Sequence, residues 1–439
     1  MRHQILFILL LLCAPFTQAQ KLEKSSLIGD PIVGSVTQNS AKVWIAYKGK
    51  GDNIVNLIDT FDNTVFQPTT LEKIGNSKED TAMVMTFTGL KPNHTYRTQI
   101  DQTNILPHHK ATFTTQTDND VRNMNFLFGS CALLNTDISR IFFPGYSSSI
   151  FWYMKRHRSD FMVWLGDNLY YLGKQATSYD RMFDRNLRIR RNFIYLQEFL
   201  ATQPHYAIWD DHDYGWNDAD KKFPLKDTAL TIFKGFWPNT YYPSDTFKGN
   251  FFTFRYYDAE FFMTDNRYYR DGPGDTMGDY FGKAQVAWLK TKLKESNATF
   301  KFICTGSQVL NDSYYGESYA SYPRERNDLF DFIAENNIPG VMFLTGDMHY
   351  TELSYREWKG YPFYDFTSSP LTSPVISWAT LYKNNYSVPG TVVRKKNFGK
   401  ISIDGPKDNR VLKMEIYNRY GRKKWERTLN AIDLVKKEK

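Results

Sequence analysis

The chain has 439 residues, of which 41% are hydrophobic and 16% aromatic. A chain of this length and composition can fill the cores of two domains, and disorder over most of its length is excluded. The formal net charge of +8 comes from Lys and Arg that are spread along the chain. This distribution argues against nucleic acid as a stable partner and fits a general surface charge that attracts anionic substrates.

The N-terminal residues 1–19 have the pattern of a secretory signal peptide. A basic start is followed by a short apolar run and a small-residue exit, with cleavage expected before Gln20. Leu12 precedes Cys13 where a lipoprotein signal requires a small residue, so a lipid anchor is disfavoured. Neither this run nor any later segment is long enough to span a bilayer comfortably. We therefore predict an exported protein, periplasmic or extracellular, with no membrane span.

Residues 26–116 are predicted to form an all-β domain. Short runs of alternating polarity are separated by turn residues, without a helical pattern between them, and this favours a β-sandwich. The runs cover 40–48, 53–61, 80–100 and 109–117. The stretch GLKPNHTYRTQI within them is similar to the corner of fibronectin type III-like domains, which usually pack or bind, so no chemistry is assigned here. The polar residues 116–125 are interpreted as a linker.

From residue 122 to residue 435, strand-like and helix-like runs alternate, which predicts a layered α/β domain. Strands are expected over 125–129, 161–166, 206–209, 261–265, 300–306 and 340–346. Helices are expected over 148–157, 225–233, 283–294 and 327–336. Two further β runs, VLKMEIYNRY and KKWERTLN, predict a hairpin near the end of the chain.

Removal of the signal peptide would leave two cysteines, Cys131 and Cys304. In an oxidising compartment, a disulfide between them is the default expectation. Cys304 stands inside a β-like run, where a small buried hydrophobic residue is the simplest interpretation. Cys131 follows the run NFLFGSC at the point where a strand would end, a position that suits chemistry better than packing.

Four of the predicted strands finish in groups that can bind a metal ion. The residues concerned are Cys131, Asp167, Tyr170, Asp211, His212, Asn217, Asp347 and His349. Ligands collect beyond the carboxyl ends of strands in α/β domains, because the loops there vary over a rigid sheet. The acidic stretch 210–218 begins inside an apolar strand, where unpaired carboxylates would cost several kcal/mol to desolvate. The sequence therefore predicts a metal centre.

Five motifs, GSC, GDNLYY, IWDDHDYGWND, TDNRYYRD and TGDMH, occur in this order behind the fibronectin-like domain. In this order they resemble the PhoD-like alkaline phosphatase family of the calcineurin-like metallophosphoesterases. The resemblance implies a four-layer α/β/β/α sandwich for residues 122–435. It also implies a secreted hydrolase of phosphomonoesters, phosphodiesters or both, which uses a hydroxide activated by metal ions.

The same resemblance implies two metal ions, Fe(III) and Ca(II), with a divalent pair such as zinc or manganese as the alternative. The implied ligands of Fe(III) are Cys131, Asp167, Tyr170 and His349. Ca(II) would share Asp167 and add Asp347, with either Asn217 or Asp211 as a further ligand; the sequence leaves this choice open. Thiolate and phenolate suit a high-valent iron, whereas carboxylate and amide oxygens suit calcium.

His212 matches the position where this superfamily carries a His near the leaving group, so a role as general acid or electrostatic stabiliser is expected, with Asp211 or Asp213 orienting it. Arg267 and Arg270 have side chains suited to forked contacts with phosphate, but each could equally pair with nearby acids. A non-catalytic surface-binding protein with a degenerate phosphatase scaffold is the alternative function. No expected type of metal ligand is missing, which favours the enzyme.

Overall fold

The computed structural model describes residues 26–48, 54–100, 110–134, 148–241, 247–272, 275–312, 318–376 and 383–437. The predicted signal peptide, including Cys13, lies outside these residues. Within the described part of the chain, no helix has the length and apolar character needed to cross a membrane.

Two antiparallel sheets form the N-terminal sandwich. The first contains β1 (Ser26–Leu27), β2 (Ile32–Gly34), β3 (Ser40–Lys48), β6 (Thr70–Gly75) and β7 (Asp80–Thr88). The second contains β4 (Val55–Asp59), β5 (Val65–Phe66), β8 (Thr95–Ile100) and β9 (Thr112–Thr114). Alternate side chains of the two sheets, such as Val43, Leu57 and Tyr96, share one buried core. The all-β N-terminal part predicted from the sequence is confirmed.

Two six-stranded sheets form the larger, C-terminal part of the fold. The first has the order β12 (His205–Ile208), β11 (Phe161–Leu165), β10 (Met124–Gly129), β19 (Asn397–Asp404), β20 (Val411–Asn418) and β21 (Lys423–Asn430). The second has the order β13 (Phe252–Tyr256), β14 (Ala259–Met263), β15 (Phe300–Thr305), β16 (Val341–Thr345), β18 (Tyr361–Thr367) and β17 (Glu352–Trp358). Strands β10 to β12 are parallel to one another, and so are β14, β15, β16 and β18.

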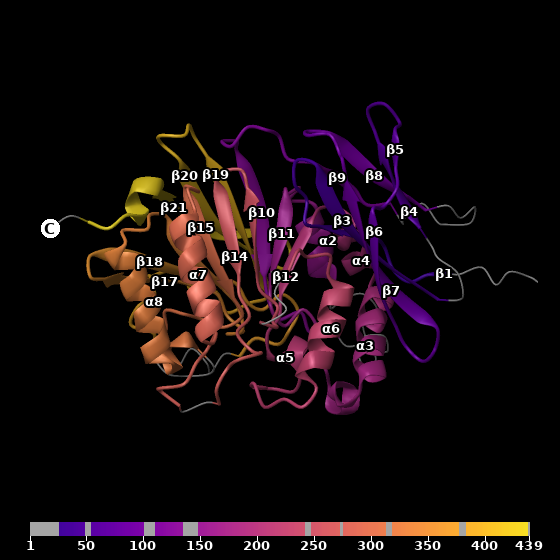
Figure 1. The fold of residues 1–439 in the computed structure, drawn as a ribbon. Helices are drawn as coiled ribbons and strands as arrows, with labels where there is room; N and C mark the ends of the chain where they lie inside the picture. The colour runs from indigo at the N-terminus through magenta and orange to yellow at the C-terminus, as the bar shows by residue number, and fades with distance from the viewer. Residues whose placement is uncertain are drawn as a thin grey trace, which may run out of the picture.

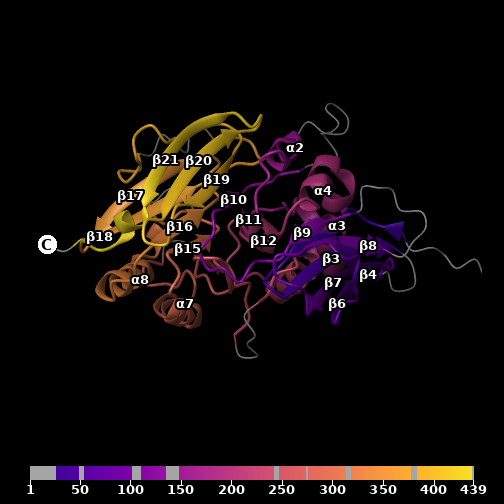
Figure 2. The same ribbon diagram turned by 90° about the horizontal axis from the view of Figure 1, so that it is seen from above.

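Helices cover the outer faces of the two large sheets, which makes four layers (Figures 1 and 2). The outer face of the first sheet packs against α2 (Ser149–Lys155), α3 (Tyr179–Asn192), α4 (Ile194–Leu200) and α6 (Lys226–Phe236). The outer face of the second packs against α7 (Lys283–Glu295) and α8 (Pro323–Glu335). An aromatic-rich core, with Phe126, Phe261 and Phe302 at its centre, fills the space between the sheets. The predicted α/β/β/α sandwich is confirmed.

Some elements were not predicted from the sequence, among them β13, β17, β18, β19, α3 and α4. Helix α3 shows why. Its buried face includes the polar residues Arg185, Asn186 and Arg190, so its sequence lacks a clean apolar stripe. The short 3₁₀ helices η1 (Gly173–Thr177) and η2 (Tyr319–Ser321) lie in connections, and η4 (Ala431–Leu434) follows β21.

The N-terminal sandwich lies at the opposite end of the molecule from α8 (Figures 1 and 2). Its Trp44 packs against Phe236 of α6, with tilted rings whose centroids are 5.7 Å apart, and its indole N–H donates to the carbonyl of Gly235 at 2.9 Å. The guanidinium of Arg190 lies 5.0 Å from the Trp44 ring. The sandwich therefore shares a continuous packed interface with the helices of the first large sheet.

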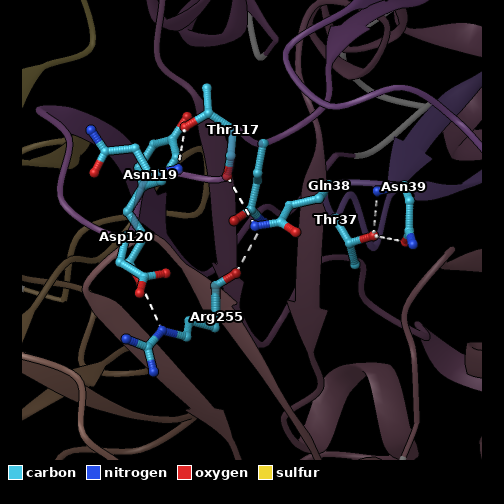
Figure 3. A pocket seen from close by; sticks show the side chains of 9 residues that line it. Thr37, Gln38, Asn39, Thr117, Asn119, Asp120 and Arg255 are labelled. Atoms are coloured by element: carbon cyan, nitrogen blue, oxygen red, sulfur yellow. Dashed lines mark hydrogen bonds between the residues drawn. The ribbon is translucent and has the colours of Figure 1, made fainter.

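A polar cavity of about 280 Å³ lies where the sandwich, the linker and β13 meet (Figure 3). Gln116 of the linker spans this junction, because its side-chain amide donates to the carbonyls of Val36 at 2.9 Å and Arg255 at 3.0 Å. Gln38 donates to the carbonyl of Thr117 at 3.1 Å. The linker leads into the start of β10, whereas the predicted metal ligands follow strand ends, so this cavity and the candidate site lie at opposite edges of the sheet.

Glycines allow the loops at the carboxyl edge to approach one another closely. A Cβ on Gly346, which follows β16, would lie 2.5 Å from the side chain of Ser130, which follows β10. A Cβ on Gly166, which has φ +86°, would lie 2.6 Å from the Cβ of Asp210. Because a side chain at either position would clash, Gly346 allows the ends of the two large sheets to approach each other, and Gly166 allows the loops after β11 and β12 to do so.

Candidate metal centre

Loops from both large sheets bring three predicted ligands together. One ligand atom each of Cys131, Asp167 and His349 lies within 4.8 Å of the others. The Cys131 sulfur lies 3.6 Å from Oδ2 of Asp167 and 3.5 Å from the carbonyl oxygen of Asp347. Cys131 follows β10, Asp167 follows β11 and His349 follows β16, so the grouping depends on both sheets ending at one edge.

Tyr170 joins this group from the same turn as Asp167. Its hydroxyl donates to Oδ2 of Asp167 at 2.9 Å and lies 3.4 Å from Nε2 of His349. The other ring nitrogen of His349, Nδ1, lies 2.6 Å from the carbonyl oxygen of Pro374. Since a carbonyl can only accept, Nδ1 carries the proton, which leaves the lone pair of Nε2 facing the group.

The backbone of these loops is unusual. Cys131, Asp167, Asp347 and His349 all have positive φ, at 58°, 54°, 66° and 54°. Residues other than glycine adopt this region at a cost of order 1–3 kcal/mol each, and such residues cluster at functional sites. Four of the predicted ligands thus share a conformation that directs strand-end side chains into the space between the loops.

Asp211 and His212 form a second group with Asp167, again with one ligand atom each within 4.8 Å of the others. Both stand at the start of α5 (Asp211–Tyr214), directly after β12. The backbone N–H of His212 donates to Oδ1 of Asp167 at 3.3 Å, and Nε2 of His212 lies 3.8 Å from Oδ2 of Asp211. The His212 ring also lies over Tyr170, with ring centroids 4.1 Å apart. Asp167 therefore belongs to both groups, as a bridging ligand would.

Asp213 fixes the turn after β11 against α5. Its carboxylate accepts from the backbone N–H groups of Asn168 at 3.0 Å, Leu169 at 3.3 Å and Asp210 at 3.1 Å. Burial raises the pKa of Asp213 to about 8, although these N–H donors oppose the rise. Through these bonds, the turn that carries Asp167 and Tyr170 has a fixed position relative to His212.

The pKa values of the clustered side chains indicate a place that would favour bound cations. Burial, followed by the nearness of Asp211 and Cys131, raises the pKa of Asp167 well above its usual range. Burial and then Asp347 raise the pKa of Cys131 to about 12, and burial and then Asp167 raise that of Tyr170. A thiol, a phenol, carboxyls and an imidazole crowded in this way are the ligand types of a metal centre, and bound cations would favour their anionic forms.

The other predicted site residues differ from one another in burial and in the partners that they contact. Asp347 is half-buried beside Cys131, whereas Asn217 is exposed in the turn after α5, and among the described residues no hydrogen bond of its side chain is found. Arg267 is fully buried and pairs with Asp210. Arg270 is buried beside the rings of Tyr280 and Tyr322. The catalytic and ligand roles of all these residues remain predictions.

The expected disulfide is absent, because Cys131 and Cys304 are both free and buried. Cys304 lies in the core between the two large sheets.

Several side chains at the centre were missed by the sequence analysis. Ser369 and Ser373 contact Cys131 and Tyr170, and Arg185 of α3 joins the carbonyls of Tyr170 and Leu134 at 2.9 and 2.8 Å. The serines follow β18 in the run YPFYDFTSSPLTS, where polar residues succeed an apolar strand. That is the same signal that identified the other four loops.

The α/β/β/α sandwich carries this donor cluster at the ends of its strands. It resembles the solved structure of a purple acid phosphatase from yellow lupin (Lupinus luteus) seeds, with a TM-score of 0.64 and 11% identity, over 92% of this chain and 74% of that one. A likeness at this identity concerns the fold alone.

A family model described as PhoD-like phosphatase matches residues 126–404, and the chain belongs to this family. It is 24% identical over 322 residues to alkaline phosphatase D of Bacillus subtilis (strain 168), a match that covers 60% of this chain and 52% of the relative. The chain thus spans about half the length of the curated relative that it matches.

Proposed function

We propose that the protein is a metal-dependent phosphatase that hydrolyses phosphomonoesters, phosphodiesters or both. The observation that carries this proposal is the convergence of a thiol, a carboxyl, a phenol and an imidazole at one sheet edge, from Cys131, Asp167, Tyr170 and His349. Membership of the PhoD-like phosphatase family and similarity to an alkaline phosphatase D support it.

We propose the ligand assignment that the family resemblance implies, and the chemistry of the side chains fits it. Cys131, Tyr170 and His349, with Asp167, would hold an iron(III) ion. Asp167 would also contribute to a calcium site with Asp347 and Asp211, with Asn217 as the alternative to Asp211. Burial of Asp211 beside Asp167 favours Asp211 over the exposed Asn217. Zinc or manganese is the alternative metal pair. When bound, such ions would neutralise phosphate charge and supply an activated hydroxide nucleophile.

The chain's own residues would orient the ester and handle its proton. His212 is half-buried and lies against the Tyr170 ring and next to Asp211, so its imidazole can donate a proton to the leaving oxygen or stabilise its charge. Burial alone would raise the pKa of Asp211, but Arg267 and His212 lower it to about 2. Asp211 therefore stays anionic and, with its Oδ2 3.8 Å from Nε2 of His212, can orient the imidazole.

We also propose that the protein is exported. The support is the signal-like pattern of residues 1–19. Expression of the full chain followed by assay of the cytoplasmic and exported fractions, with N-terminal sequencing of the product, tests this. A start at Gln20 in the exported fraction is expected. Uncleaved protein confined to the cytoplasm would exclude export.

The purified full chain should be assayed with aryl phosphate monoesters and diesters, together with elemental analysis of its metals. Turnover of at least one ester class, with bound metal in the same preparation and loss of both in C131A, is the expected result. Folded, metal-replete protein that is inert on both classes would contradict the proposal and favour a non-catalytic binding protein.

A further inference from the structure

The segment after β18, residues 368–373, lies directly against the loop that carries Cys131. The backbone N–H of Leu371 donates to the carbonyl of Ser130 at 2.9 Å, and those of Thr372 and Ser373 donate to the carbonyl of Cys131 at 3.2 and 3.1 Å. Ser369 and Ser373 are both fully buried. Their hydroxyls are therefore fixed relative to the candidate ligands and shielded from solvent.

Ser369 connects two of these ligands. Its hydroxyl oxygen accepts the backbone N–H of His349 at 3.0 Å and lies 3.2 Å from the sulfur of Cys131. A hydroxyl has one hydrogen, and an N–H can only donate, so the oxygen serves as acceptor towards His349. The hydrogen of Ser369 is then free to donate to the sulfur.

Ser373 repeats this arrangement at the phenol. Its oxygen accepts the backbone N–H of Leu133 at 3.2 Å, and its hydroxyl donates to the Tyr170 oxygen at 3.0 Å. The hydroxyl of Tyr170 itself donates to Asp167. Ser373 can therefore keep its bond when Tyr170 has lost its proton, because the bond requires only a lone pair on the phenol oxygen.

We propose that Ser369 and Ser373 are positioning residues of the metal centre, each donating one hydrogen bond to one anionic ligand, Cys131 and Tyr170 respectively. The inference rests on the proposed function, since it assumes that these two side chains ligate metal. Hydrogen bonds of this kind fix ligand orientation and tune donor strength, and their loss typically weakens metal binding about 10–100-fold.

Two neighbouring serines differ from this pair in the direction of their hydroxyls. Ser368 is equally buried in the same segment, but its hydroxyl points to the side chain of Asn397 at 3.2 Å and the carbonyl of Phe128 at 3.5 Å. Ser130 lies 3.5 Å from the Cys131 sulfur, but its single hydrogen has a closer acceptor in the carbonyl of Ser368 at 3.1 Å. Ser130 thus shares its hydrogen between the sulfur and a carbonyl, whereas the Ser368 hydroxyl contacts neither ligand, so Ser368 is the matched control.

The test is a Co(II) titration of the metal-free full chain, followed by absorption spectroscopy. A charge-transfer band that is present in the wild type and missing in C131A reports the bond between sulfur and metal. We expect S369A and S373A to bind Co(II) about 10–100-fold more weakly. The sulfur band should shift in S369A alone, and S368A should match the wild type. S373T keeps the hydroxyl and should restore binding relative to S373A.

Thermal unfolding of the metal-free variants separates positioning from folding. Equal melting temperatures of S369A, S373A and S368A, with weaker binding in the first two only, support the inference. Binding by S369A and S373A as tight as that of S368A, or an equal loss in all three, would overturn it while leaving the proposed function intact. No sulfur band in the wild type would instead reject Cys131 as a ligand, and with it both proposals.

Discussion

The guanidinium of Arg267 holds the carboxylate of Asp210, with Nε and one terminal nitrogen both 2.5 Å from Oδ1. Both side chains are buried, with exposed fractions of 0% and 1%. The side chain of Asn266 donates to the same oxygen at 2.8 Å. Arg267 also lies 3.8 Å from Asp211, so part of the positive charge that faces the acidic stretch 210–218 comes from the protein itself.

Replacement of Arg267 should therefore affect folding first. In R267A, Asp210 would be buried without its cation, and breaking such a pair costs about 3–5 kcal/mol of unfolding free energy. R267K keeps the positive charge but loses the contact of two guanidinium nitrogens with Asp210, so an intermediate loss of unfolding free energy is expected. Denaturant unfolding measures both. If R267A kept its stability and only raised KM, Arg267 would contact substrate instead.

Replacement of the two cysteines should affect different properties, metal content for Cys131 and stability for Cys304. C131A should lose bound metal because it removes a buried ligand, with little loss of packing. C304A, in the core between the sheets, should cost on the order of 1 kcal/mol in stability and keep its metal content. Elemental analysis and thermal unfolding of the two variants check this. Full metal content in C131A would exclude the thiolate.

The choice between Asp211 and Asn217 can be decided by paired variants. Asp211 is buried next to Asp167, and its Oδ2 accepts the backbone N–H of Asp218 at 2.8 Å, whereas Asn217 is exposed. We expect D211N to weaken binding of the second metal and N217A to leave it unchanged. Isothermal titration with calcium measures this. The reverse result would assign the site to Asn217.

His212 should matter most for esters with poor leaving groups. If it donates the leaving-group proton, H212A should lower kcat about 100–10,000-fold for alkyl esters and much less for nitrophenyl esters, whose leaving group needs no proton. His94, which lies 2.7 Å from Asp59 in the N-terminal sandwich, provides the control H94A, for which both rates should be unchanged. Equal losses for both ester classes in H212A would favour electrostatic stabilisation.

His205 should make stability depend on pH below neutrality. It is fully buried, Trp164 donates to its Nδ1 at 3.0 Å, and burial lowers its pKa from 6.5 to about 3. The unfolded chain takes up a proton near pH 6.5 but the folded chain does not. The contribution of neutral His205 to the free energy of unfolding is therefore complete above pH 6.5. It decreases as pH falls towards 3, by about 1.4 kcal/mol per pH unit.

The variant H205Q lacks this proton uptake. Urea unfolding of both proteins in metal-free buffer between pH 6.5 and 4.5, roughly the first half of this window, should show a shallower decline for H205Q. Parallel declines would mean that His205 becomes charged in the folded protein.

Local patterns in the sequence were sufficient for much of the fold and for the composition of the candidate site. Alternating runs predict strands such as β3 and β7, and helical spacing predicts α7. Polar groups directly after apolar strands identify Cys131, Asp167 and His349, which the structure brings together. These features could be predicted because strand periodicity, and the position of a residue at a strand end, are properties of neighbouring residues.

Tertiary structure alone decided which partner each polar side chain finds. Ser373 and Tyr170 are separated by 203 positions, and Arg267 and Asp210 by 57, yet each pair forms a buried hydrogen bond. Such contacts depend on how two sheets and their loops pack, so no local pattern determines them. The sequence by itself determined which metal-binding side chains follow the strands. The packing of the sheets and loops decided that two serines hydrogen-bond to Cys131 and Tyr170, and that Arg267 pairs with the acidic residues next to them.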